Sequence, residues 1–397
     1  MGLYNLYTRP LARLSAGLKE LRDPPPAGNL PCLDVLRSLA ISLVFVYHMQ
    51  GNFPHALRTL KSPVVRFGWT GVDLFFILSG LLLGGQLWRE LKATETVRVG
   101  RFILRRGFRV WPLYYSLVVF LLAERIFLGI KRPGLYLWLD ATFLDNYFTS
   151  HHQIGGGWSL ALEEQFYLVI PIVLMVGAKF IRPRSLVRLT CIWFLALPLI
   201  RYFALLGCTT PDARHHAVNY SFFTHSDGLA IGLVISWIMN WKPELLKDRR
   251  WLDVALVGVV LGGFSLWYVA PLTFLYSVVA LSYGALTFLL LRTRLHFILP
   301  SRIFYIISRL SFGVYLIHAG LLEHVMPYHT ELFGEGFRSY LLAFILWGTV
   351  SLALAFVSFS FIELPFLQLR DRRRSVVVPA STGQPLTTES LAFTRLS

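Results

Sequence analysis

Two titratable or charged side chains stand eleven residues apart in the first long apolar stretch of the sequence. Arg37 and His48 both fall within residues 33–51, which are otherwise largely apolar. Eleven helical steps of about 100° return to within roughly 20° of the starting direction, so both side chains share one face, about 16 Å apart. A histidine there could act as a general base, and an arginine could stabilise developing negative charge. The alternative makes Arg37 a membrane-surface anchor and His48 an interfacial histidine.

Four carboxylates are predicted to lie within apolar segments at a depth similar to that of His48, namely Asp73, Glu163, Glu164 and Asp227. Each would cost about 2.5–3.5 kcal/mol on insertion scales, which makes each a candidate functional residue. If they face the interior, they form a polar chamber in which Glu163 or Asp73 orients His48 as a base. Glu163 and Glu164 diverge by about 100°, so we expect only one to face the chamber. The alternative for Asp73 and Glu163 is stabilisation of a helix N-terminus.

A basic segment precedes the third apolar stretch. Arg98, Arg101, Arg105 and Arg109 are spaced by three or four residues, which predicts one basic face of an amphipathic helix. Such a face could attract anionic lipid headgroups, the interpretation that composition alone favours. It could also bind a phosphorylated cytosolic ligand, because guanidinium groups match phosphate oxygens.

The elements that must position these residues are apolar helices. The 397 residues are 55% hydrophobic and 15% charged, with a mean hydropathy of +0.56, whereas about a quarter of residues are charged in soluble domains. We therefore predict an all-α integral membrane protein, a polytopic bundle of about ten transmembrane helices. The predicted spans are residues 33–51, 68–88, 111–130, 158–178, 186–206, 220–240, 251–270, 272–292, 309–326 and 340–361.

The distribution of basic charge predicts the orientation. The sequence has 38 Lys and Arg residues and 22 Asp and Glu residues. If the chain crosses the membrane at each predicted span, most of the basic residues lie in segments on the same side of the membrane. The positive-inside rule then places both termini in the cytoplasm, in a multi-pass protein of the cytoplasmic (inner or plasma) membrane. The charge thus indicates orientation, and we expect no nucleic-acid partner.

The chain divides into three parts. Residues 1–29 lack the apolar core of a signal peptide and are predicted to be a cytoplasmic arm. Residues 30–369 form the membrane domain, and residues 370–397 are a basic and then disordered cytoplasmic tail. The three cysteines and the absence of CxxC and HExxH motifs predict neither a disulfide framework nor a metal site. The histidine pairs at 151–152 and 215–216 are expected to be solvated loop residues.

Six motifs in order resemble the acyltransferase 3 family of integral-membrane enzymes. They are the Arg37 and His48 pair with ten residues between them, and segments 71–80, 105–114, 158–167, 227–232 and 311–318. The resemblance implies transfer of an acyl group, most simply from acetyl-CoA, to a hydroxyl of a carbohydrate such as a surface polysaccharide or glycolipid. In this interpretation His48 is the general base or a transient acyl carrier.

Roles for the candidate residues follow from the resemblance together with their predicted positions. We assign catalysis to His48, Arg37, Glu163 and Asp73; donor binding to Arg101, Arg105, Arg106 and Arg109; and substrate contacts to Ser79, Trp158, Ser159, Asp227 and His318.

The sequence departs from the family pattern at two places. His225 stands where an arginine is common two residues before Asp227, which could alter recognition of acceptor or acyl group. Glu363-Leu364-Pro365 replaces the usual Glu-Arg/Lys-Pro, where we expect only a structural helix end. Some members carry a C-terminal SGNH-type esterase domain, and we expect none here, because a tail of about 30 residues is too short to form one.

Two other classes of function stay open. A transporter or flippase would also place carboxylates and histidines within the membrane, although no inverted repeat is visible. An inactive member acting as a binding partner is the third hypothesis, which the intact Arg37 and His48 disfavour. The acceptor, the acyl chain length and the oligomeric state stay open at this stage.

Overall fold

Each of the ten predicted spans corresponds to a helix. The computed structural model describes residues 2–26, 29–50, 67–129, 134–148, 154–247, 249–293, 301–334 and 336–375, and within them all regular structure is helical. The ten helices are α2 (Pro31–Gln50), α5 (Gly71–Thr94), α6 (Val99–Phe127), α9 (Gly157–Gly177), α10 (Pro183–Leu206), α12 (Asp227–Trp241), α13 (Arg250–Leu266), α14 (Leu272–Arg292), α15 (Ser301–Phe333) and α16 (Phe337–Ser358).

The predicted all-α membrane architecture is confirmed. Among the described helices, eight are long and apolar enough to cross a membrane. The other two predicted spans are shorter helices, α12 with 15 residues and α13 with 17. The predicted count of about ten therefore holds as an approximate number.

Shorter elements join or cap these helices. They are α1 (Gly2–Arg22), η1 (Gly68–Thr70), α7 (Gly134–Ala141), α8 (Asp145–Phe148), α11 (Pro211–Asn219), η2 (Pro243–Leu246), the π-helical turn η4 (Phe359–Glu363) and α17 (Leu364–Ser375). The predicted tail thus begins inside helix α17, and residues 376–397 lie outside the described residues, as do His151 and His152.

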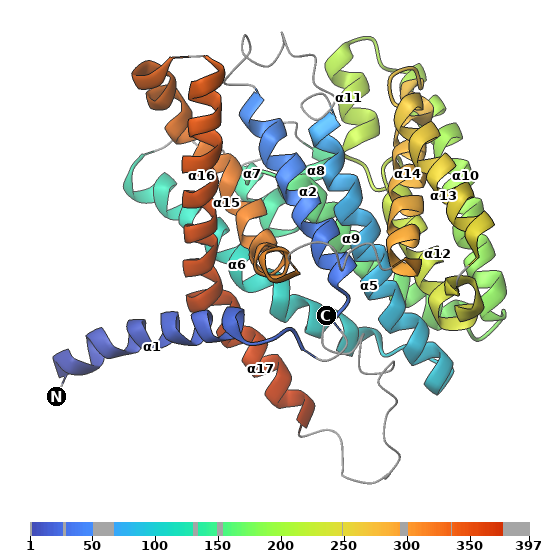
Figure 1. Cartoon of the computed structure of the whole chain (residues 1–397), viewed down its shortest axis with the longest axis horizontal. Coiled ribbons are helices and arrows are strands. Elements are labelled where there is room, and N and C mark those ends of the chain that lie inside the picture. The colour runs from blue at the N-terminus through green and yellow to red at the C-terminus, as the bar shows by residue number, and fades with distance from the viewer. Residues whose placement is uncertain are drawn as a thin grey trace.

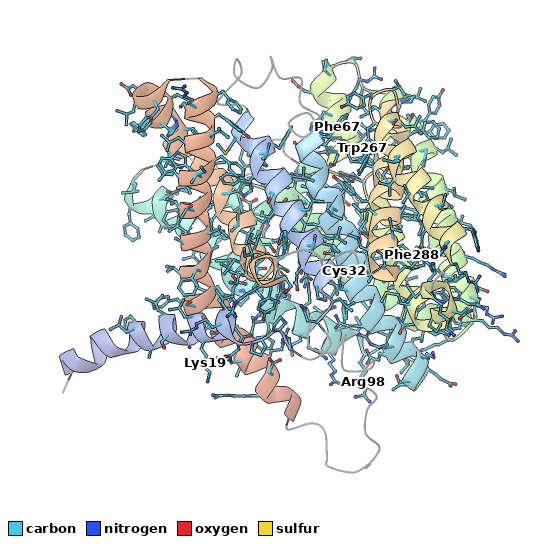
Figure 2. All side chains as sticks on the ribbon, viewed as in Figure 1. Lys19, Cys32, Phe67, Arg98, Trp267 and Phe288 are labelled. Atoms are coloured by element: carbon cyan, nitrogen blue, oxygen red, sulfur yellow. The ribbon has the colours of Figure 1, made fainter. Side chains whose placement is uncertain are left out.

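The two ends of the bundle differ in their side chains. Figure 1 shows α2 and α5 in the middle of the bundle, with α1 and α17 at one end and α11 at the other. Figure 2 shows Lys19 and Arg98 near the first end, and Phe67 and Trp267 toward the second. We call these the α1 end and the α11 end.

The basic segment and the third span form one continuous helix. The amphipathic segment was expected to precede a span that starts near residue 111, but α6 runs without interruption from Val99 to Phe127. Gly107 and Pro112 both lie inside it. Arg106 and Arg109 of α6 are therefore carried into the bundle, where they line one cavity with residues of α2 and α9.

Helices α5 and α12 approach closely because glycines line both sides of their contact. A Cβ atom on Gly80 would meet the backbone of Leu229, and one on Gly232 would meet the backbone of Ile77 and Leu81. Small residues allow such close contact between helices in lipid. The second predicted span thus packs closely against α12 at Gly80.

This contact predicts a difference between two glycine substitutions. Alanine gains up to about 1 kcal/mol over glycine in a helix, so Gly262→Ala, whose Cβ meets nothing within 4 Å, should be neutral or stabilising. Gly232→Ala should destabilise the bundle by about 1–3 kcal/mol, because the backbone of α5 must move. Thermal unfolding of both variants in detergent checks this, and equal midpoints would contradict the proposed contact.

Candidate functional site

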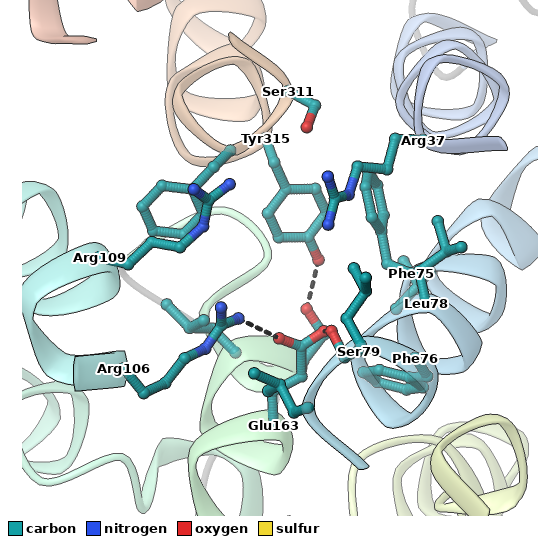
Figure 3. Close-up of a pocket in the computed structure, with 16 residues that line it drawn as sticks. Arg37, Phe75, Phe76, Leu78, Ser79, Arg106, Arg109, Glu163, Ser311 and Tyr315 are labelled. Carbon is teal, nitrogen blue, oxygen red and sulfur yellow. Dashed lines mark hydrogen bonds and ion pairs between the residues drawn. The ribbon is translucent and has the colours of Figure 1, made fainter. Parts of the chain in front are cut away.

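A cavity lies between five helices in the bundle. It encloses about 90 Å³, several times the roughly 10–15 Å³ that one water molecule needs. Helices α2, α5, α6, α9 and α15 contribute its walls (Figure 3). Its polar lining residues are Arg37, Ser79, Arg106, Arg109, Ser159, Glu163, Ser311 and Tyr315.

The cavity carries more positive than negative charge. Arg106 and Arg109 are three residues apart on α6 and share one face, and Arg37 joins them from α2. Glu163 is the one carboxylate among the described lining residues. Arg37 and Arg109 find no hydrogen-bond acceptor within the part of the chain that the structure describes. Their guanidinium groups are therefore available to an anionic ligand.

The third cavity arginine, Arg106, is held by contacts with other side chains of the protein. The guanidinium of Arg106 donates a 2.8 Å hydrogen bond to the hydroxyl of Tyr167, lies over that ring at 4.6 Å, and is 3.8 Å from Glu163 Oε2. Glu163 in turn accepts hydrogen bonds from Ser79 (2.9 Å) and Tyr167 (2.5 Å). This network joins α5, α6 and α9 at one wall of the cavity.

Only part of the predicted basic face of α6 lines the cavity. Arg98 and Arg101 are exposed at the start of α6, and Arg105 does not line the cavity. Arg106 and Arg109 do, because Tyr167 and Glu163 of α9 lie opposite Arg106. Spacing along α6 predicts which arginines share a face, but the neighbouring helix decides which face is buried.

Glu163 and Glu164 diverge as their adjacency requires. Glu163 lines the cavity, whereas Glu164 accepts a 3.2 Å hydrogen bond from Trp111 Nε1 and is not among the lining residues.

Two histidines form a pair close to the cavity. His318 Nε2 of α15 lies 3.2 Å from His48 Nδ1 of α2. His318 Nδ1 contacts the carbonyl oxygens of Val314 and Tyr315, and His48 Nδ1 contacts that of Val44 at 2.9 Å. A carbonyl oxygen only accepts, so both Nδ1 atoms carry the hydrogen and His318 Nε2 accepts from His48. This leaves a free lone pair on Nε2 of His48. The His48 residue is exposed, whereas His318 is fully buried.

Tyr315 connects the cavity to the histidine pair. Its side chain lines the cavity, and its hydroxyl is hydrogen-bonded to Ser159 (Figure 3). Its ring centroid lies 6.0 Å from that of His318, three residues further along α15. The histidine pair is therefore adjacent to the cavity through Tyr315, although neither histidine is among the lining residues.

The predicted single chamber is instead divided into separate networks. A carboxylate, Glu163 or Asp73, was expected beside His48, but the neighbour found is His318, and no described carboxylate contacts His48. Glu163 serves the arginine cavity, and Asp73 lies 3.0 Å from His225 Nε2. His48 and the four carboxylates of the predicted chamber come from four helices, α2, α5, α9 and α12, and depth along the membrane normal alone does not determine which of them meet.

The remaining predicted substrate contacts lie outside the cavity. Asp227 is fully buried in a two-pronged ion pair with Arg201 of α10, with distances of 2.8 and 3.2 Å, and accepts a hydrogen bond from Ser277. Trp158 stacks on His225 at 5.8 Å. Of the predicted substrate residues, Ser79 and Ser159 line the cavity and His318 belongs to the histidine pair.

Sequence reasoning missed Arg201. It was not among the candidate residues, although it falls within the predicted span 186–206, and its side chain is 0% exposed inside the bundle. A single arginine within the apolar run 195–206 was the signal that could have found it. Arg201 supplies Asp227 with a guanidinium partner in a chain where His225 replaces the expected arginine.

Within the described residues, no group of three or more His, Cys, Asp or Glu could hold a metal ion.

Comparison with known proteins gives a match over most of the chain. A family model described as an acyltransferase domain matches residues 30–362. The peptidoglycan O-acetyltransferase OatA of Listeria monocytogenes is 26% identical over 252 residues, which cover 57% of this chain and 37% of that protein. The O-acetyltransferase OatA of Staphylococcus aureus is 24% identical over 387 residues, 89% of this chain and 60% of that protein.

The chain spans about half the length of the curated relatives it matches. No solved structure matches it.

The buried ion pair predicts a large effect of one substitution. Arg201→Met leaves the Asp227 carboxylate buried without its partner, which typically costs about 3–5 kcal/mol. Thermal unfolding in detergent should therefore show a clear loss of stability. Lys242→Met is the control, since the Lys242 and Glu244 side chains are 43% and 46% exposed and their pair should contribute little. Equal shifts in both variants would contradict a special role for Arg201.

Proposed function

The chain belongs to the acyltransferase family whose domain matches residues 30–362, as its motifs predicted, and we propose that it is a membrane-bound O-acyltransferase. It transfers an acyl group, most simply acetyl from acetyl-CoA, to a hydroxyl of a carbohydrate. The observation that supports this proposal is the arginine-lined cavity, one lining residue of which, Tyr315, lies beside His318, the partner of His48.

The names of the relatives support the acceptor class. One relative is a peptidoglycan O-acetyltransferase, and peptidoglycan contains carbohydrate with free hydroxyl groups. A surface polysaccharide, a glycolipid or another lipid-linked glycan would present the same nucleophile.

The arginines suit the anionic part of the donor. Arg37, Arg106 and Arg109 offer guanidinium groups that match phosphate oxygens, and one carboxylate leaves the cavity with an excess of positive charge. Arg37 lies eleven residues before His48 on α2, about 16 Å along the helix axis. An extended arm ending in a thioester could therefore be held at the arginines and react near the histidines.

His48 is the proposed general base. Its Nε2 lone pair removes the proton from the acceptor hydroxyl as the oxygen attacks the thioester carbonyl carbon. The carbon–sulfur bond then breaks, the thiolate leaves, and the proton on His48 passes to the sulfur to give free coenzyme A. The positive charge on His48 during this step is stabilised by the hydrogen bond from its Nδ1 to His318 Nε2. A transient acyl-His48 would use the same nitrogen.

The orientation follows from the positive-inside rule. We place the α1 end in the cytoplasm, because Lys19 and Arg98 lie near it, and the helices α1 and α17 with them (Figures 1 and 2). The donor would then enter from the cytoplasm of a cell bounded by this membrane, and the acceptor would meet His48 from the α11 end.

Removal of the base tests the reaction directly. His48→Ala should lower acetyl transfer from acetyl-CoA to a glycan acceptor by about 10²- to 10⁴-fold, the usual contribution of general base catalysis. His324→Ala is the control, because His324 is an exposed histidine of α15. Purified protein with labelled acetyl-CoA gives the rates. Near-normal transfer by His48→Ala would overturn the mechanism, and no turnover by the wild-type protein would favour a transporter.

Substitutions of two arginines of α6 distinguish binding of the donor in the cavity from attraction of the donor by the basic surface. Arg109→Gln should raise KM for acetyl-CoA at least about 10-fold, since a hydrogen bond to a charged group contributes about 1.5–3 kcal/mol. Arg101→Gln removes the same charge from an exposed position of the same helix and should leave KM unchanged. A similar rise in both variants would mean that the basic surface, and not the cavity, attracts the donor.

A further inference from the structure

A second hollow lies on the outer surface of α6. It has a volume of about 360 Å³, and it shares no lining residue with the arginine cavity. Its lining residues on α6 run from Leu104 to Tyr115, about 16 Å along the helix axis, and Phe366 of α17 adds one wall. We call this hollow the α6 groove.

The α6 groove exists because a small residue lies among large ones. Gly107 has no side chain, and the ring of Trp111 lies over it so closely that a Cβ atom there would be 2.6 Å from the ring. Around this floor stand side chains that project from the protein, Leu104 at 46% and Phe366 at 42% exposed. The rings of Phe366 and Phe108 lie 6.5 Å apart. The groove is therefore a narrow hollow with aromatic walls.

The polar atoms of the lining side chains are occupied by partners inside the protein. Trp111 Nε1 donates a 3.2 Å hydrogen bond to Glu164, and the hydroxyl of Tyr115 donates one of 3.1 Å to the carbonyl oxygen of Ala141. The groove therefore offers apolar surface to a ligand. Within a bilayer such a surface binds by close packing, which suits a flexible hydrocarbon chain.

A positive charge lies at one end of the groove. Arg101 precedes Leu104 by three residues and Phe108 by seven, so all three lie on one face of α6. The Arg101 side chain is exposed and makes no hydrogen bond or ion pair within the part of the chain that the structure describes. Arg98, one turn earlier, is also exposed. The charge that the arginine cavity leaves unused therefore begins where the groove begins.

The length of α6 places this charge at the depth of lipid headgroups. The helix has 29 residues and is about 43 Å long, which matches a bilayer of about 40–45 Å including both headgroup layers. Arg101 lies in its first turn, and the groove begins at Leu104, about 7 Å from the helix start. A lipid whose headgroup lies at Arg101 would therefore have its chain beside the groove.

We propose that the α6 groove binds one hydrocarbon chain of an anionic phospholipid, and that Arg101 binds the headgroup of the same lipid. Basic residues next to a membrane-spanning helix attract anionic headgroups, and the groove adds a shaped site for the chain. This assigns different ligands to the two parts of the basic segment, the arginine cavity to Arg106 and Arg109 and the lipid to Arg101. The inference does not depend on the proposed acyl transfer.

The headgroup contact is tested by lipid binding to the full-length protein in neutral detergent. Native mass spectrometry counts bound phosphatidylglycerol, which is anionic, or phosphatidylcholine, which is neutral overall. Wild type should bind one phosphatidylglycerol about 5-fold more tightly, the factor expected for one basic residue near the surface. Arg101→Gln should remove this preference. Arg188→Gln is the matched control, an exposed arginine in the second turn of α10, and should keep it. No preference in wild type, or an equal loss in both variants, would overturn the proposal.

A photoreactive group on the lipid chain tests the groove itself. Phosphatidylglycerol with a diazirine in its chain should crosslink within residues 104–115 or at Phe366. Phe366→Ala removes one wall and should lose most of this crosslink, whereas Phe127→Ala, at an 81% exposed phenylalanine at the far end of α6, should retain it. Crosslinks only elsewhere would overturn the proposal, as would displacement of the lipid by inorganic phosphate alone. If Phe366→Ala folds poorly, the position of the wild-type crosslink still decides.

Discussion

Compensation of arginine charge inside an apolar bundle is the constraint on which the rest of this structure depends. A guanidinium group stays charged, so each one taken into the bundle needs an acceptor or an acid from elsewhere. Arg201 of α10 is matched by Asp227 of α12, Arg106 of α6 by Glu163 of α9, and Arg309 of α15 by Glu20 of α1. Each of these pairs joins two helices, so the placement of charge also determines which helices must be neighbours.

The cavity is where this compensation is incomplete. Three arginines meet there with one carboxylate, and that carboxylate already accepts hydrogen bonds from Ser79 and Tyr167. The closely packed contact of α5 with α12 fixes one wall, and α6 brings its arginines to the opposite side. The bundle compensates Arg201 fully and leaves the cavity positive, so its positive charge is available to an anionic ligand such as the proposed donor.

Periodicity and hydropathy predicted the features that one helix determines by itself. The ten helices were found, and Arg37 and His48 both face α15, because Arg37 shares the cavity with Ser311 and Tyr315 while His48 contacts His318. Features that depend on two helices were not predicted. The neighbour of His48, the burial of Arg201 and the choice of Arg106 over Arg101 all depend on which side chain of another helix lies opposite. Spacing along one segment carries no such information, because contacts between distant segments are set by packing.

The use of a second histidine instead of a carboxylate beside His48 has a physical reason in this setting. A carboxylate is charged in its resting state, and inside a membrane it would need a permanent partner such as the arginines that Glu163 and Asp227 have. Two neutral imidazoles need none. In the reaction proposed here, charge would arise on His48 only while it holds the proton of the acceptor, and the buried His318 could accept its hydrogen bond at that moment. In that proposal the base lies away from the arginines, at the exposed His48, where a hydroxyl acceptor would reach it while the phosphates of the proposed donor stay at the arginines.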